Sequence, residues 1–297
     1  MFSASDVAFS GFRAGREHLG SMLIWIVVLG LVSVAMTVAF LPTFGPVLME
    51  FQAMGQNPST PPDPEQALAL LQKLGMAMGP LFFFALLQNA VLYAAVNRLM
   101  LRPQDSAFGY LRVGADELRM FLVSLLTVLL LMGLYIAGIV AVVALVAAAA
   151  AVNKALIPFA VAAGIVGMLG VFVVVVVRLS LAKSQTFATG RVNLFGSWAL
   201  TRGHFWSILG TYLLAFIMAL IVQLAVQAIV MLLVVLFGGG FAGVGQMYQP
   251  DLSSLKSLMT PPMLIRMGAG LILAPFLWLI MLCPAPDIYR SLTAARS

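Results

Sequence analysis

Long apolar runs separated by short polar stretches dominate the hydrophobic pattern of this chain. A hydrocarbon core of roughly 30 Å needs about 20 helical residues at 1.5 Å each. Six runs reach that length, and they lie near 20–41, 78–98, 121–151, 157–178, 205–237 and 262–283. They lack the alternation of a barrel strand, so the pattern predicts an all-α polytopic bundle of six transmembrane helices.

Composition agrees with a membrane protein. Hydrophobic residues make up 62% of the chain, charged residues 9%, and the mean hydropathy is +1.07. A soluble globular domain carries about a quarter charged residues, so this class is excluded. Nineteen residues, several of them charged, precede the first run, which is also longer than a signal-peptide core; we expect a permanent anchor. Residues 1–297 are expected to form one membrane domain.

Charge orients the bundle. Twelve of the 16 Lys and Arg residues lie on one side of the spans, in 1–19, 98–120, 178–204 and 284–297, and this side carries a net charge of +6. The positive-inside rule therefore predicts that both termini are cytoplasmic, in a bacterial inner membrane. A basic face of this kind suits anionic phospholipids as partners. The sequence contains no basic tail or nucleic-acid-reading module, so no nucleic-acid partner is expected.

A weak internal repeat precedes alternate spans. Residues 9–19 read FSGFRAGREHL and residues 108–118 read FGYLRVGADEL. Both place an arginine four residues before an acid, as Arg13 with Glu17 and Arg112 with Asp116, opposite an apolar face. The pattern predicts short interfacial helices, each followed by a glycine elbow into the membrane.

A third copy lies in VNLFGSWALTRGHFWSIL, where Arg202 is the charge, Gly203 the elbow and Trp206 the aromatic at the headgroup level. At the other end of each unit an arginine closes an even-numbered span: Arg98, Arg178 and Arg290. The chain therefore reads as three pseudo-repeats, about 5–101, 105–183 and 190–292. We expect these three arginines to extend to lipid phosphates, and together with Arg202 they are the candidate lipid-headgroup contacts.

One segment resembles a known family. The run RLSLAKSQTFATGRVNLFGSWALTRGHFWSILG, 178–210, is similar to the membrane domain that some bacteria fuse to glycerophosphoryl diester phosphodiesterase. The resemblance rests on an arginine and a Leu-Ala pair after a long apolar helix, then a Trp, a Leu-Thr-Arg-Gly element and a Phe-Trp pair. The resemblance implies a six-helix membrane domain. It does not imply phosphodiesterase activity, because that chemistry belongs to a separate barrel domain in the fused proteins.

The sequence offers little chemistry. Its two histidines, His18 and His204, lie at equivalent elbows, and no metal-binding spacing such as HExxH or CxxC occurs. Asp116 and Glu117 are interpreted as a solvated helix face, and the single cysteine, Cys283, as a buried apolar residue. We therefore expect no enzyme activity, no metal and no cofactor. The intramembrane amides, which are Gln88, Asn89, Gln223 and Gln227, are expected to bond a neighbouring helix.

The longest loop, about 42–77, contains NPSTPPDPEQALALLQKLG. Asp63 or Ser59 could cap a helix whose first turn contains Pro64, and this helix is interpreted as a continuation of the second span.

Two functions remain open. The first is a non-catalytic scaffold or accessory factor that engages anionic lipid, and another membrane protein could then be its partner. The second is a lipid-handling transporter or flippase, favoured by the equivalent arginines and the apolar interior. A membrane-embedded lipid enzyme is a weaker alternative, because no catalytic cluster is visible.

Overall fold

A computed structural model describes residues 3–55 and 64–294, and this part of the chain is all-α, without a strand. The described residues form six long helices and several short ones. The long helices are α3 (Leu19–Gly55), α4 (Pro64–Leu101), α5 (Ala115–Val152), α6 (Ile157–Leu179), α9 (Phe205–Phe237) and α11 (Pro261–Leu282). The short ones are α1 (Ala4–Ala8), α2 (Ser10–Glu17), η1 (Ala107–Tyr110), η2 (Lys154–Leu156), α7 (Ala182–Thr189), α8 (Gly196–Leu200), α10 (Gly240–Tyr248) and α12 (Pro284–Ala294).

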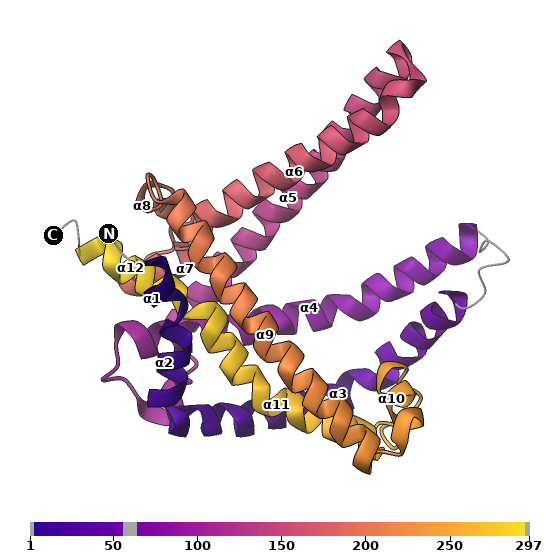
Figure 1. Cartoon of the computed structure of the whole chain (residues 1–297), viewed down its shortest axis with the longest axis vertical. Helices are drawn as coiled ribbons and strands as arrows, with labels where there is room; N and C mark the ends of the chain where they lie inside the picture. The colour runs from indigo at the N-terminus through magenta and orange to yellow at the C-terminus, as the bar shows by residue number, and fades with distance from the viewer. Residues whose placement is uncertain (1–2, 56–63, 295–297) are drawn as a thin grey trace.

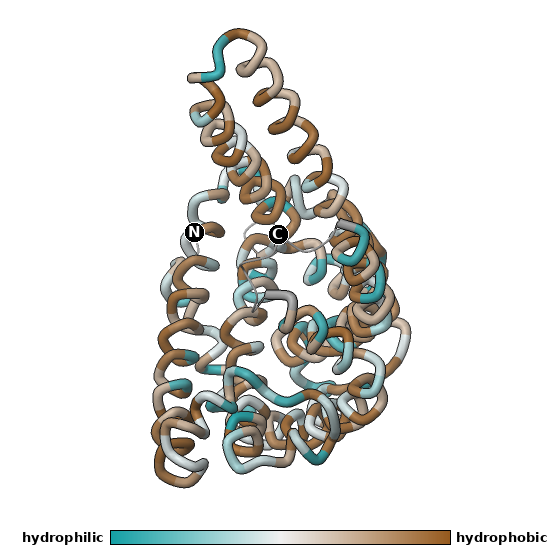
Figure 2. Tube along the Cα trace, turned by 90° about the vertical axis from the view of Figure 1, so that its right-hand side faces the viewer, coloured by the Kyte–Doolittle hydropathy of each residue, from teal (hydrophilic) through white to brown (hydrophobic). Residues whose placement is uncertain are grey.

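The six predicted spans are confirmed. All six long helices are long and apolar enough to cross a membrane, and Figure 2 shows hydrophobic colouring along most of their length. Several apolar side chains on α5 and α6 are largely exposed, including Val140, Val143 and Val166. An apolar exterior of this kind suits lipid as the surrounding solvent. The chain is therefore a multi-pass membrane protein.

The long helices form three antiparallel hairpins, α3 with α4, α5 with α6, and α9 with α11. The hairpins meet at one end, and the α5–α6 pair extends away from the rest as an arm (Figure 1). At the common end α4, α6 and α11 finish, α3, α5 and α9 begin, and both termini lie there (Figure 1). We call this end the basic side, because the four arginine-rich segments gather there.

The core is concentrated at the basic side. Trp25 of α3 is 1% exposed and packs with Leu92 and Val96 of α4. A second cluster joins Ile208 of α9 to Ile288 of α12, and both side chains are fully buried. A separate buried cluster packs Val230 and Val234 of α9 against Val244 and Met247 of α10 at the far end. The far part of the α5–α6 arm contributes to none of these clusters.

Short helices precede α3 and α9, at two of the three positions where the sequence predicts interfacial helices. α2 ends at Glu17 with His18 as its C-cap, α3 begins at Leu19, and α8 leads through Gly203 to α9. Gly203 has φ +85°, a left-handed conformation that glycine adopts without strain. The predicted elbow at Gly203 is confirmed, whereas Gly15 of the first repeat lies inside α2 and its turn falls at His18.

The predicted helix over 108–118 is wrong. A single 3₁₀ turn, η1, precedes extended backbone at Leu111, and α5 begins only at Ala115. Gly109 has φ +62° and accepts a 2.7 Å hydrogen bond from Trp25 Nε1 through its carbonyl. Tertiary contacts therefore override the local helical pattern. The expected pair of Arg112 with Asp116 is not formed; Arg112 lies 3.9 Å from Asp105 instead.

Helix α2 packs backbone to backbone on α11. A Cβ added at Gly11 would overlap the Leu279 carbonyl oxygen and the Cα of Ile280. Only glycine allows this approach. The close packing places the face of α2 that carries Arg13 beside α12. There Arg13 Nη2 lies 4.0 Å from Asp287, and its other contact is the Asp6 carbonyl at 2.9 Å. The expected partner of Arg13, Glu17, makes no ion pair among the described residues.

The far side of the membrane holds two of the other predicted features. α4 begins at Pro64 and runs without interruption to Leu101, so the loop helix continues the second span as predicted; the candidate caps Ser59 and Asp63 lie outside the described residues. Gln227 donates a 3.1 Å hydrogen bond to the Tyr248 hydroxyl of α10, as expected for an intramembrane amide. Asn89 differs, since its amide bonds Ala85 of its own helix.

Candidate functional site

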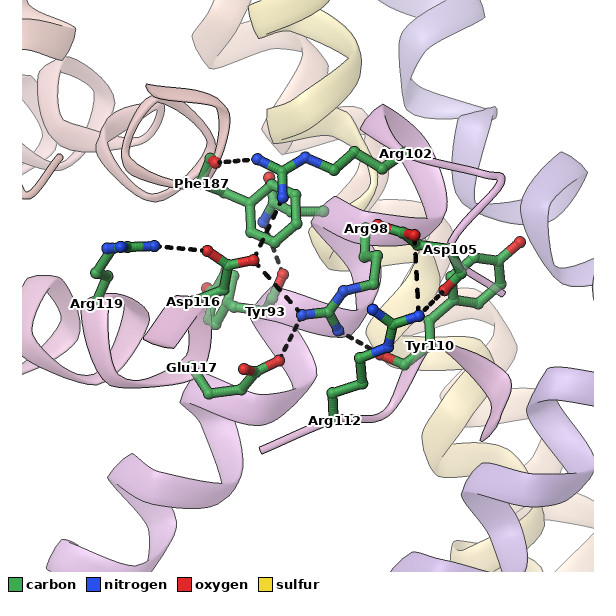
Figure 3. Close-up of polar contacts among 11 residues, drawn as sticks. Tyr93, Arg98, Arg102, Asp105, Tyr110, Arg112, Asp116, Glu117, Arg119 and Phe187 are labelled. Atoms are coloured by element: carbon green, nitrogen blue, oxygen red, sulfur yellow. Dashed lines mark hydrogen bonds and ion pairs between the residues drawn. The ribbon is translucent and has the colours of Figure 1, made fainter. Parts of the chain in front are cut away.

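Arg98 lies at the centre of a polar cluster on the basic side (Figure 3). It comes from the last turn of α4, and its side chain is 3% exposed. Nη2 lies 2.6 Å from Glu117 Oε1 on α5, and Nη1 donates a 2.5 Å hydrogen bond to the Tyr110 carbonyl. Burial of an ion pair is tolerated when the geometry is close and other hydrogen bonds are made, as they are here.

Asp116 is the second carboxylate of the cluster. Its Oδ1 lies 2.8 Å from Arg119 Nη1, and its Oδ2 lies 3.3 Å from Arg102 Nη1 and 3.8 Å from Arg98 Nη2. We call these five residues the Arg98 cluster: Arg98, Arg102, Asp116, Glu117 and Arg119. Three cations face two carboxylates, so the cluster keeps a net charge of +1 at neutral pH.

The cluster also fixes α7. The Phe187 ring lies beneath two guanidinium groups, with its centroid 4.6 Å from Arg102 Cζ and 5.7 Å from Arg98 Cζ. Arg102 Nη2 in addition donates a 3.2 Å hydrogen bond to the Phe187 carbonyl. Phe187 is 1% exposed. Cation–π contacts in such a dry setting are worth more than at an exposed surface, so α7 is held firmly against α4 and α5.

These positions differ from the sequence-based expectations. Arg98 was expected to extend to lipid phosphates, but it is enclosed and already bonded. The interpretation of Asp116 and Glu117 as a solvated face is wrong for Glu117, whose relative exposure is 5%. Spacing alone does not reveal the pair, because Arg98 and Glu117 are 19 positions apart on different helices.

Arg178 and Arg202 lie near α8, outside the Arg98 cluster. Arg178 is partly buried, donates a 3.4 Å hydrogen bond to Thr201 Oγ1, and lies with Cζ 5.9 Å from the centroid of the Trp198 ring. Arg202 is exposed. Trp198 and Trp206 are also exposed, at 40% and 78%. Exposed indoles next to cations are typical of the headgroup level of a membrane.

Arg290 lies on α12, away from the other three predicted arginines. It is exposed and pairs with Asp287 at 3.1 Å, the same carboxylate that Arg13 approaches. A cavity of about 260 Å³ lies here, lined by Arg13, His18, Asp287 and Arg290 among others. The structure therefore divides the four predicted arginines into three locations. Only Arg178 and Arg202 share one.

A larger cavity lies between α4, α5, α6, α9 and α11, close to the basic side. Its volume is about 550 Å³, and apolar side chains such as Leu131, Val176 and Leu209 form most of its wall. Lys183 of α7 reaches this cavity, and its Nζ lies 3.4 Å from the centroid of the Tyr93 ring, which also lines it. Sequence reasoning counted Lys183 only as a charge. Its position one helical turn before Phe187 was the available signal, since both side chains then face α4.

A second apolar cavity, of about 690 Å³, lies between α3, α4 and α5. Phe84 and Phe121 are part of its wall, and Gln88 and Arg112 are among the few polar residues that reach it. Both of these cavities are within the range of roughly 300–1,000 Å³ seen for ligand sites.

The clustered acids have little freedom for proton transfer or metal binding. Both carboxylates of the Arg98 cluster are engaged by guanidinium groups. Within residues 3–55 and 64–294, no group of three His, Cys, Asp or Glu side chains could hold a metal ion. Cys283 is a free, fully buried thiol, as the sequence predicted. The arrangement therefore provides exposed cations that can bind anions and apolar cavities that can bind hydrophobic groups.

Comparison with protein-family models, with curated protein sequences and with solved structures gives no match for this chain.

Proposed function

We propose that this chain is a scaffold or accessory factor of a bacterial inner membrane that binds anionic phospholipid at its cytoplasmic face. The observation that carries the proposal is the display of Arg202 beside exposed Trp198 and Trp206, with Arg178 next to them. Exposed indoles favour the headgroup level of a membrane, and guanidinium groups at that level can bond phosphate in bidentate geometry. Arg290 adds a further exposed cation on the same side.

Arg98 does not belong to the proposed lipid surface, because its bonds to Glu117 and Tyr110 occupy it. The buried cluster instead supports a rigid basic side on which the exposed arginines are presented. The net charge of +6 on the basic side also supports the proposal, because it favours contact with an anionic leaflet. We also propose kinship with the phosphodiesterase-associated membrane domains, on the Leu-Thr-Arg-Gly element that ends at Gly203.

The test is lipid retention by native mass spectrometry. Protein is released from nanodiscs of phosphatidylcholine and phosphatidylglycerol, and bound lipid is counted. The variant Arg178→Gln/Arg202→Gln/Arg290→Gln is expected to lose most bound phosphatidylglycerol, since each cation contributes about 1 kcal/mol near an anionic surface. Its matched control removes three cations from the opposite side: Lys73→Gln/Lys154→Gln/Lys256→Gln. Equal retention in the two triple variants would refute the proposal.

A lipid-handling transporter is the second candidate. The specific observation in its favour is the pair of apolar cavities between spans, of about 550 and 690 Å³. A fluorescent phospholipid in proteoliposomes, bleached from outside by dithionite, measures transfer between leaflets. Faster bleaching of inner-leaflet lipid than in protein-free vesicles would favour the transporter. Identical bleaching kinetics would refute lipid transfer and favour the scaffold.

A further inference from the structure

We propose that the cavity beside α7 binds an acidic amphiphile, with one acyl chain between the spans and the anionic headgroup held by Lys183. This site is separate from the exposed arginines and does not depend on the function proposed above. A carboxylate or a phosphate monoester or diester could supply the negative charge.

The first step of the argument is the state of Lys183. Among the residues that the structure describes, no carboxylate forms an ion pair with it. Its Nζ lies over the face of the Tyr93 ring, 3.4 Å from the ring centroid. A ring face attracts a cation but leaves the N–H groups that point away from it without acceptors. Burial lowers the pKa of the Lys183 amine to about 7, and an anion held against the amine would favour its charged form.

The second step is the chemistry of the wall. Apart from Lys183 and the tyrosines, the polar side chains at the cavity are Thr127 and Ser180, and both hydroxyls donate to carbonyls of their own helical turns. The rest of the wall is aliphatic or aromatic, with Leu131 and Val176 among its members. A small hydrophilic anion would gain nothing from such a wall, whereas an acyl chain would bury its surface there.

The third step is size and position. A volume of about 550 Å³ is in the middle of the range of ligand sites and suits one chain better than two. Much of the lining comes from the last turns of α6 and α11 and the first turns of α9, so this part of the cavity lies near the basic side. Thr127 and Leu131 of α5 line the part that lies deeper between the spans. Near the basic side a headgroup can reach water while its chain points into the membrane.

The fourth step is the mechanical support of Lys183. Phe187, one turn later on α7, is clamped by Arg98 and Arg102. The ammonium is therefore held over the cavity by a rigid support, and the net positive cluster behind it adds to the attraction for an anion. Preorganisation of this kind lowers the entropic cost of binding.

The test is equilibrium binding of radiolabelled oleate to the full-length protein in detergent. Unlabelled competitors are lysophosphatidylglycerol, lysophosphatidylcholine and inorganic phosphate. We expect saturable oleate binding and effective competition by lysophosphatidylglycerol, with little competition by the zwitterionic lipid or by phosphate. If oleate binds and lysophosphatidylglycerol fails to compete, the site takes carboxylates; if both bind, it takes either headgroup. Displacement of oleate by lysophosphatidylcholine or by inorganic phosphate would overturn the proposal, and so would the absence of saturable oleate binding.

Variants test the two halves of the site. Lys183→Gln is expected to weaken oleate binding about tenfold or more, because a charge-assisted contact is lost. Lys183→Arg should bind close to wild type. The matched control is Lys154→Gln, an exposed lysine at the far tip of the α5–α6 arm. Leu131→Trp narrows the chain-binding part and leaves Lys183 in place, so it should also reduce binding. Unchanged binding in Lys183→Gln or in Leu131→Trp would refute the assignment.

Discussion

Arg98 and Glu117 form a buried ion pair with 2.6 Å between Nη2 and Oε1, although they belong to different helices. Their side chains are 3% and 6% exposed. The pair joins the end of α4 to the start of α5, and through Phe187 it also positions α7. The ion pair and the Phe187 contact therefore hold the basic-side ends of α4, α5 and α7 together.

Removal of one member of this pair should destabilise the protein strongly. Arg98→Met leaves Glu117 buried without a counter-charge, and breaking a buried pair costs roughly 3–5 kcal/mol of unfolding free energy. Differential scanning fluorimetry in detergent measures the change. Arg112→Met, at an exposed pair 3.9 Å long, is the control and should change stability little. The double variant Arg98→Met/Glu117→Leu should recover part of the lost stability. Equal melting temperatures for Arg98→Met and Arg112→Met would contradict the role of the pair.

The close approach of α2 to α11 gives a second prediction. Gly11→Ala introduces a Cβ that meets the Leu279 carbonyl and the Ile280 backbone, so α2 must move away. We expect a loss of about 1–3 kcal/mol, typical of overpacking at a tight contact. Gly20→Ala is the matched control, because nothing lies within 4 Å of its added Cβ in α3. An equal melting temperature for both variants would show that α2 does not pack as described.

Gly203 tests the elbow into α9. Its φ of +85° favours glycine, and an added Cβ meets nothing within 4 Å, so the cost of Gly203→Ala is backbone strain alone. That strain is roughly 1–2 kcal/mol. Gly210→Ala, inside α9 and also without a neighbour within 4 Å, should be neutral or slightly stabilising. Thermal unfolding of the two variants checks the difference, and its absence would argue against a left-handed residue at position 203.

The proposed orientation predicts which positions react from outside the cell. Lys154→Cys, at the exposed tip of the α5–α6 arm, should be labelled in intact cells by a maleimide that does not cross the membrane. Arg202→Cys, exposed on the basic side, should react only after the cells are opened. Native Cys283 gives little background because it is fully buried. The reverse pattern would place the basic side outside and contradict cytoplasmic termini.

The local parts of the fold were accessible from the sequence. The spans, the helix that continues span two to Pro64 and the turn at Gly203 all depend on residues that are close together in the chain. The segment 108–118 was mispredicted because its apolar spacing matches a helix, while bonds from Trp25 and Arg98 to its carbonyls favour a tight turn. Those partners are 84 and 12 positions away from the residues they bond.

The candidate site divides in the same way. Arg178, Arg202 and Arg290 were predicted from their places at span ends. The structure leaves Arg202 and Arg290 exposed and Arg178 partly buried, and their contact with lipid stays a prediction. Lys183 was overlooked, because its proposed role in anion binding depends on a cavity to which five long helices contribute. No pattern along one helix shows that its neighbour leaves such a space.

Hydropathy by itself determined that this chain crosses a membrane six times, because the transfer of some 20 apolar residues into lipid outweighs any local preference. Charge placement by itself separated a basic side from a nearly neutral one. Only the tertiary structure decided which cations are used internally. Arg98 and Arg202 look alike in sequence, but a neighbouring helix brings Glu117 to the first and leaves the second exposed. Burial and partner together, rather than residue type, determine whether an arginine stabilises the fold or is available to lipid.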